Sequence, residues 1–121
     1  MTHALLRSSL LALHGALVES ERRAYEKQHG RLQNGEFLQA LVREPALAWL
    51  APFTSLVARF DEIDSGKDAV AQRRTWRARV RALLLGKNDF SARYAARLEA
   101  SPDVAFAHAA ALHALKATGK D

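Results

Sequence analysis

Three polar side chains share one side of a long apolar segment near the start of the chain. His14, Glu21 and Tyr25 are spaced by seven and four residues, which aligns them along a helix. An imidazole, a carboxylate and a phenol in a row are suited to passing protons or binding a metal ion. The row equally fits the flank of a core, with Glu21 paired to an arginine, because an unpaired buried carboxylate is unfavourable. We favour this second interpretation.

A metal site with nitrogen and oxygen ligands would need donors from several helices. The residues available for it are His14, Glu21, Asp61, Asp64 and His108. Di-iron bundles carry Glu-x-x-His on two helices, whereas this chain has a single match, Glu26-Lys-Gln-His29. It also lacks a nucleophile motif and a glycine-rich phosphate loop. We therefore predict no metal, no cofactor and no catalytic residue, and expect His108 to be a satisfied core residue.

Positive charge is concentrated in one segment. The chain has a net charge of +5, and residues 73–98 hold eight Lys and Arg residues against Asp89 alone. If the two helices of this segment are antiparallel neighbours, they form a basic face for nucleic acid, an acidic protein or a membrane surface. The alternative is a solvated face balanced by acidic groups elsewhere. The predicted contact face comprises Arg74, Arg77, Arg81, Arg93 and Arg97.

The elements that must position these residues are all helices. Ala, Leu, Arg and Glu are abundant, and no segment alternates with the period of a strand. Residues 1–117 are predicted to form a single-domain, all-α bundle of five to six helices, with 118–121 frayed. We expect helices over about 2–29, 36–43, 45–64, 65–85, a fifth from Asn88 or Asp89, and 102–116.

The stretch PALAWLAPF, residues 45–53, contains two prolines within an apolar helical pattern. Pro45 suits the first turn of a helix, whereas Pro52 interrupts one. The apolar stripe that begins at Phe53 extends backwards onto Leu50 and Trp49, so its phase is kept across Pro52. We predict a proline-kinked helix or two helices that meet at a tight bend, with Trp49 in the core.

The composition restricts the cellular setting only partly. The chain has no cysteine, so disulfides and thiolate metal sites are excluded. No apolar run approaches the roughly 20 residues of a membrane span. Arg7 precedes an apolar run as in a signal peptide, but no cleavage site follows and the helical pattern continues. We expect the protein not to be secreted.

Residues 10–64 show a pattern that extends beyond single helices. It runs from Leu13-His14 through Glu21, Tyr25-Glu26, Gly35-Glu36 and the Ala-Trp-Leu-x-Pro stretch to Asp61-Glu62. This order resembles a family of small, uncharacterised bacterial proteins that are all-helical. The resemblance implies a bacterial, cytoplasmic protein and groups His14, Glu21, Tyr25, Trp49, Pro52 and Asp61. It implies no activity, since none is assigned to that family.

Two functions from different classes follow from these residues. We favour a non-catalytic bundle that binds an acidic protein or nucleic acid through its arginines, as a monomer or a homodimer. The alternative is a bundle that binds a small ligand or metal, including as an enzyme. That site would comprise His14, Glu21, Tyr25, Trp49 and Asp61.

Overall fold

The computed structural model describes residues 2–63 and 68–118, and all of its regular elements are helices. They are α1 (Thr2–His29), α2 (Asn34–Arg43), α3 (Pro45–Ala48), α4 (Ala51–Glu62), α5 (Ala69–Leu85), α6 (Asp89–Ala100) and α7 (Pro102–Thr118). The all-α prediction is confirmed, but the described residues hold seven helices rather than five to six. Ser65, the expected start of the fourth helix, Asp64 of the proposed metal set and residues 119–121 lie outside the described residues.

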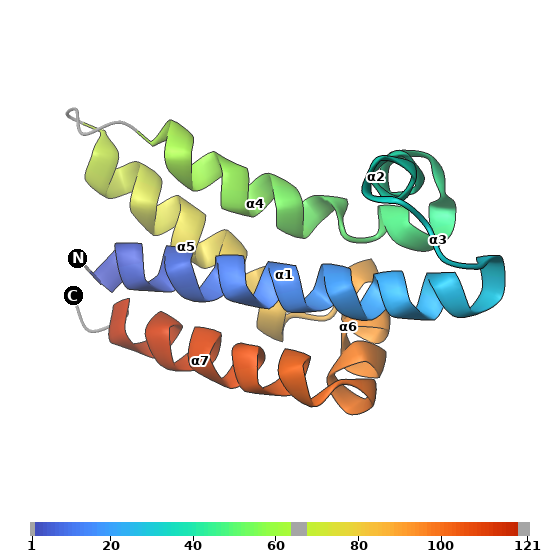
Figure 1. Cartoon of the computed structure of the whole chain (residues 1–121). Coiled ribbons are helices and arrows are strands. Elements are labelled where there is room, and N and C mark those ends of the chain that lie inside the picture. The colour runs from blue at the N-terminus through green and yellow to red at the C-terminus, as the bar shows by residue number, and fades with distance from the viewer. Residues whose placement is uncertain (1, 64–67, 119–121) are drawn as a thin grey trace.

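The long helix α1 is the axis of the bundle. Figure 1 shows α4 on one side of it and α7 on the other, with α5 passing behind. Helix α7 runs antiparallel to α1 and lies against it, so the start of α1 and the end of α7 lie at the same end of the molecule. Helices α2, α3 and α6 gather at the opposite end (Figure 1).

One continuous core joins the long helices. Four leucines of α1 are 0–2% exposed and repeat with the spacing of a helical stripe: Leu6, Leu10, Leu13 and Leu17. Against them pack Phe53 from α4, Trp76 from α5 and Tyr94 from α6, together with the small buried residues Ala111 and Ala114 of α7. Small side chains let α7 approach α1 closely. The Trp76 indole N–H donates to the Leu56 carbonyl at 2.7 Å, so this buried polar group is satisfied.

The additional helix arises in the two-proline stretch. Helix α3 ends at Ala48, Trp49 and Leu50 form a turn, and α4 begins at Ala51 with Pro52 in its first turn. Proline is accommodated there because first-turn N–H groups have no partner within the helix. The expected 45–64 helix is therefore broken rather than kinked, which explains the larger number of helices. Leu50 and Phe53 both enter the core, so the apolar phase is kept across the break.

Local capping defines most other helix starts. Asn88 caps α6 by accepting from the N–H groups of Phe90 and Ser91, and Ser101 caps α7 by accepting from Val104 N–H at 3.3 Å. Helix α2 begins two residues earlier than predicted, at Asn34. Its preceding residue, Gln33, donates its N–H to the Glu36 carboxylate at 3.1 Å. None of the helices in the described part of the chain is long and apolar enough to cross a membrane.

Two glycines provide a matched test of the backbone. Gly15 lies on the exposed side of α1, and a Cβ there would meet nothing within 4 Å. Gly86 ends α5, and a Cβ there would lie 2.4 Å from the Ala82 carbonyl oxygen. Gly15→Ala should raise the free energy of unfolding by about 0.5–1 kcal/mol, because alanine favours the helix. Gly86→Ala should lower it by about 1–3 kcal/mol. Urea unfolding measures both, and equal effects would contradict the assigned end of α5.

Candidate functional site

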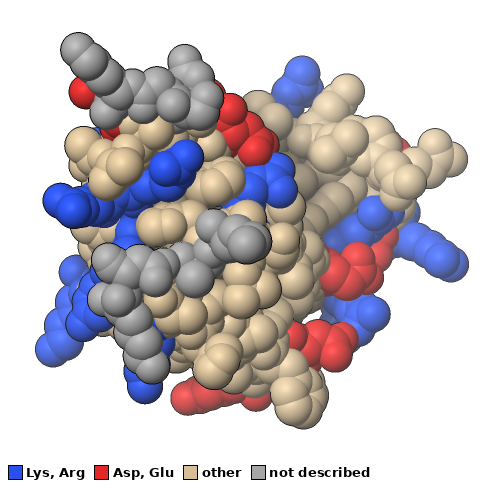
Figure 2. All heavy atoms as spheres, turned by 90° about the vertical axis from the view of Figure 1, so that its left-hand side faces the viewer, with Lys and Arg blue, Asp and Glu red and all other residues tan. Residues whose placement is uncertain are grey.

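The α5 helix gathers five arginines that have no acidic partner among the described residues, whereas only three other arginines lack one: Arg31, Arg43 and Arg93. Arg7, Arg22, Arg23, Arg59 and Arg97 each form an ion pair with Asp or Glu. Within residues 2–63 and 68–118, no carboxylate lies in ion-pair range of the five α5 arginines: Arg73, Arg74, Arg77, Arg79 and Arg81. Figure 2 shows Lys and Arg side chains gathered along its left edge. This edge is the side of the molecule that faces away from the viewer in Figure 1, where α5 runs.

The core sets the direction of these arginines. Trp76, Val80 and Leu84 turn one face of α5 inward, so Arg74 and Arg81 project from another and are exposed. Arg77 lies between the two faces and is partly buried. Its guanidinium donates to Thr118 Oγ1 at 2.8 Å and to the Leu115 carbonyl at 3.2 Å. A cation is favourable there because the last carbonyls of a helix carry negative partial charge.

The two α6 arginines of the predicted face are engaged with other elements. Arg93 donates to the Ala46 carbonyl at 3.1 Å and thereby contacts α3. Arg97 forms an ion pair with Glu21 of α1, with Nε and Oε1 3.2 Å apart. These contacts hold α6 against the rest of the fold. Of the five residues predicted for the basic face, only Arg74 and Arg81 have no such contact with a described residue.

Glu21 connects the two residue sets that the sequence placed in separate sites. Its side chain is only 14% exposed, and its second oxygen accepts from the Trp49 indole N–H at 3.3 Å. The Trp49 ring packs against Phe90, with the ring centres 5.1 Å apart. Beside this cluster lies an open hollow of about 200 Å³, lined by Glu21, Trp49, Arg93, Ala96 and Arg97. The pairing with an arginine of another helix agrees with the core-flank interpretation.

The other residues of the predicted ligand site have separate partners. His14 Nε2 lies 2.7 Å from Thr54 Oγ1, and its ring packs against Phe53. The Tyr25 ring stacks on His29 with centres 4.0 Å apart. Asp61 accepts two hydrogen bonds from Arg7, at 2.8 and 3.0 Å, and these lower the pKa of its carboxyl. In the described part of the chain, no three His, Asp or Glu residues are arranged to hold a metal ion.

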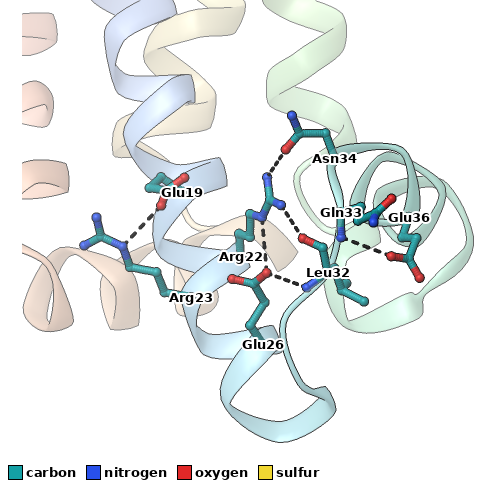
Figure 3. Close-up of polar contacts among 8 residues, drawn as sticks. All are labelled: Glu19, Arg22, Arg23, Glu26, Leu32, Gln33, Asn34 and Glu36. Atoms are coloured by element: carbon teal, nitrogen blue, oxygen red, sulfur yellow. Dashed lines mark hydrogen bonds and ion pairs between the residues drawn. The ribbon is translucent and has the colours of Figure 1, made fainter.

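Arg22 and Glu26 form a polar contact that sequence reasoning missed. Arg22 donates to Asn34 Oδ1 at 2.9 Å and to the Leu32 carbonyl at 2.7 Å, while Leu32 N–H donates to Glu26 at 2.8 Å (Figure 3). The bond from Leu32 is the main cause that lowers the pKa of Glu26. The contact fixes the connection between α1 and α2. Its only sequence signal is the spacing of four between Arg22 and Glu26.

Tyr94 and His108 form a second pair that was not expected. The Tyr94 hydroxyl lies 2.5 Å from His108 Nδ1, at the contact of α6 with α7. Burial raises the pKa of Tyr94, so its phenol stays protonated. Burial also lowers the pKa of His108. This hydrogen bond satisfies His108 as expected, although the residue is partly buried and lies at the edge of the core rather than within it.

Comparison with protein-family models, with curated proteins and with solved structures finds no significant match. The chain is therefore classified by its own geometry, as an all-helical bundle whose α5 arginines have no carboxylate partner among the described residues. The resemblance of residues 10–64 to a bacterial family stays a prediction.

The contacts of Glu21 with Arg97 and Trp49 should contribute to stability in a graded way. Glu21→Gln keeps an acceptor for Trp49 but loses the charge that faces Arg97, and should lower the free energy of unfolding by about 1 kcal/mol. Glu21→Ala removes both contacts and should lower it by about 2–3 kcal/mol. Glu19→Ala is the control, because the Glu19–Arg23 ion pair is exposed and should contribute under about 1 kcal/mol. Equal losses at Glu19 and Glu21 in urea unfolding would show that the cluster does not hold α6.

Two partly buried histidines should make stability depend on pH. Burial lowers the pKa of His14 and of His108 below the ordinary 6.5. The unfolded chain therefore takes up protons before the folded protein does, so stability is full above about pH 6.5 and falls as the pH decreases towards 5. The pKa values of the Asp61 and Glu26 carboxyl groups are lowered from their ordinary 3.8 and 4.5. The stability that these two groups contribute is therefore lost only as the pH falls below those values.

Replacing both histidines by glutamine should flatten that dependence. The difference between the unfolding free energies at about pH 7 and pH 5 should shrink in His14→Gln/His108→Gln. The exposed His113→Gln serves as the control and should leave the difference unchanged. A wild-type protein that becomes more stable towards pH 5 would contradict the sign.

Proposed function

We propose that this protein is a non-catalytic binding module that holds an acidic macromolecule against α5. The observation that carries the proposal is the concentration on one helix of five arginines without a carboxylate partner among the described residues. Of the eight arginines outside α5, five have carboxylate partners among the described residues, whereas none of the five on α5 has one. The acidic partner belongs to one of two classes, a protein or a nucleic acid.

The spacing of these charges supports an external partner. Arg73, Arg77 and Arg81 follow one another at intervals of four, and like charges at this spacing destabilise a helix by about 0.2–0.5 kcal/mol per pair. An external anion removes this repulsion, because each guanidinium offers several donors to carboxylate or phosphate oxygens. Binding to an acidic surface is thus favoured by the same charges that disfavour the free helix.

Further parts of the proposal rest on the resemblance and on the charge. We place the protein in the bacterial cytoplasm, as the resemblance implies. The binding form is a monomer or a homodimer, which sedimentation of the purified protein with and without an acidic polymer distinguishes. No residue is proposed to be catalytic.

A second candidate function is the binding of a small anionic ligand beside Glu21. The hollow of about 200 Å³ has two guanidinium groups, one indole and the Glu21 carboxylate on its wall, and Glu21 is paired with Arg97. Trp49 reports on it directly, since its indole N–H bonds to Glu21. Titration with small carboxylates and phosphates should change the Trp49 fluorescence in a Trp76→Phe variant if the hollow is a site. An unchanged spectrum would leave the α5 surface as the only proposal.

Removing the exposed α5 charges should abolish binding to acidic polymers. Arg74→Glu/Arg81→Glu and the control Lys27→Glu/Arg43→Glu each lower the formal net charge from +5 to +1, and all four residues are exposed. Anisotropy with single-stranded RNA and with polyglutamate should show tight, salt-sensitive binding for the wild type. The α5 variant should bind at least about tenfold more weakly, with a salt slope lower by about two.

The control variant separates a local surface from general charge. It should bind the better polymer within about threefold of the wild type, because its substitutions lie on α1 and α2. Equal weakening in both variants, or no binding of either polymer by the wild type, would overturn the proposed function.

A further inference from the structure

The exposed side of α5 carries apolar residues at both ends of its arginine row. Val70 and Leu85 are 59% and 51% exposed, although both are large hydrophobic residues. Between them lie Arg74, Arg77 and Arg81, so the five positions follow at intervals of four, three, four and four. These intervals are those of one continuous stripe on a helix.

The stripe is narrow and long enough for another helix. At 100° per residue its five positions span a sector of about 80°, and Val70 and Leu85 are about 22 Å apart along the axis. Rows of residues three and four apart are the ridges with which helices pack against each other. Arg77 is held at the end of α7 by Leu115 and Thr118, so the middle of the stripe is partly ordered before a partner arrives.

The positive charge of the arginines determines which residues the central turns of a partner helix should carry. Arg74 and Arg81 are exposed and have no carboxylate partner among the described residues, so they match Glu or Asp side chains. The apolar ends favour a protein over a nucleic acid, because a phosphate backbone offers nothing apolar to cover Val70 and Leu85. A helix with carboxylates in the middle and leucines about four turns apart complements all five positions.

We propose that the partner of α5 is an acidic amphipathic helix of another protein, which lies along the stripe from Val70 to Leu85. This inference rests on the proposed function and adds the class of partner to it. Carboxylates of the docked helix face Arg74 and Arg81, and its terminal leucines cover Val70 and Leu85. The complex is thus held by charge in the centre and by apolar contact at the ends.

A designed peptide tests the inference. The probe is an alanine-based peptide of about 18 residues, ~27 Å long when helical, with Glu in its central turns and Leu at both ends of one stripe. A second peptide has Gln in place of both Leu residues and keeps the charge. Val70→Gln/Leu85→Gln is the test variant. Leu38→Gln/Val42→Gln is the control, because Leu38 and Val42 are 62% and 82% exposed on α2.

The wild type should bind the leucine peptide about tenfold more tightly than the glutamine peptide, and the Val70→Gln/Leu85→Gln variant should lose this preference. The Leu38→Gln/Val42→Gln control should keep it. Binding of polyglutamate should be unchanged in both variants, since it depends on the arginines alone. Circular dichroism and urea unfolding confirm that the variants are folded, which is expected for exposed positions.

Three other outcomes separate the inference from the function on which it rests. Equal affinity for both peptides, with polyglutamate bound through Arg74 and Arg81, overturns the helix inference and leaves the proposed function standing. Tight binding of RNA with no binding of either peptide identifies a nucleic acid and also overturns the inference. No binding of peptides, polyglutamate or RNA overturns the proposed function itself.

Discussion

The packing of four leucines on α1 is the interaction on which the rest of the structure depends. Leu6, Leu10, Leu13 and Leu17 are almost fully buried and face α4, α5, α6 and α7 within one core. Burial of a leucine side chain contributes about 1.5–3 kcal/mol, so this stripe is a large part of the marginal stability of a small domain. Because Trp76 and Val80 of α5 turn towards the same core, Arg74 and Arg81 on another side of the helix are left exposed.

The polar contacts of the bundle follow from this arrangement. Once α1 lies at the centre, its flanks meet α4 through the Arg7–Asp61 and His14–Thr54 contacts. Glu21 meets the turn between α3 and α4 through Trp49, and meets α6 through Arg97. In each of these contacts, a polar group that the sequence predicted as a possible site residue has a partner within the fold. On α5, by contrast, Arg74 and Arg81 are exposed and have no contact of this kind with a described residue. The candidate binding surface is therefore identified by charges that have no partner among the described residues, and not by unusual residue types in the core.

Local patterns predicted the elements well, since they depend on neighbouring residues. The leucine stripe, the Ser101-Pro102 start of α7 and the bend near Pro52 all follow from residues close in sequence. Residues close in sequence did not decide between a kink and a break at Trp49–Leu50, because both keep the same apolar phase. The partners of Arg77 and Glu21 also lay beyond prediction. They depend on which helix ends meet in space, and many arginines of this chain were equally available to Glu21.

On the proposed function, α5 and no other surface meets the acidic partner. Backbone amide shifts in a ¹H–¹⁵N spectrum, recorded during titration with the acidic helical peptide, test it most directly. We expect the largest changes on residues 70–85, with smaller changes at the adjoining end of α7, where Arg77 contacts Leu115. Changes centred on Glu21, Trp49 and Arg93, with α5 unaffected, would contradict it.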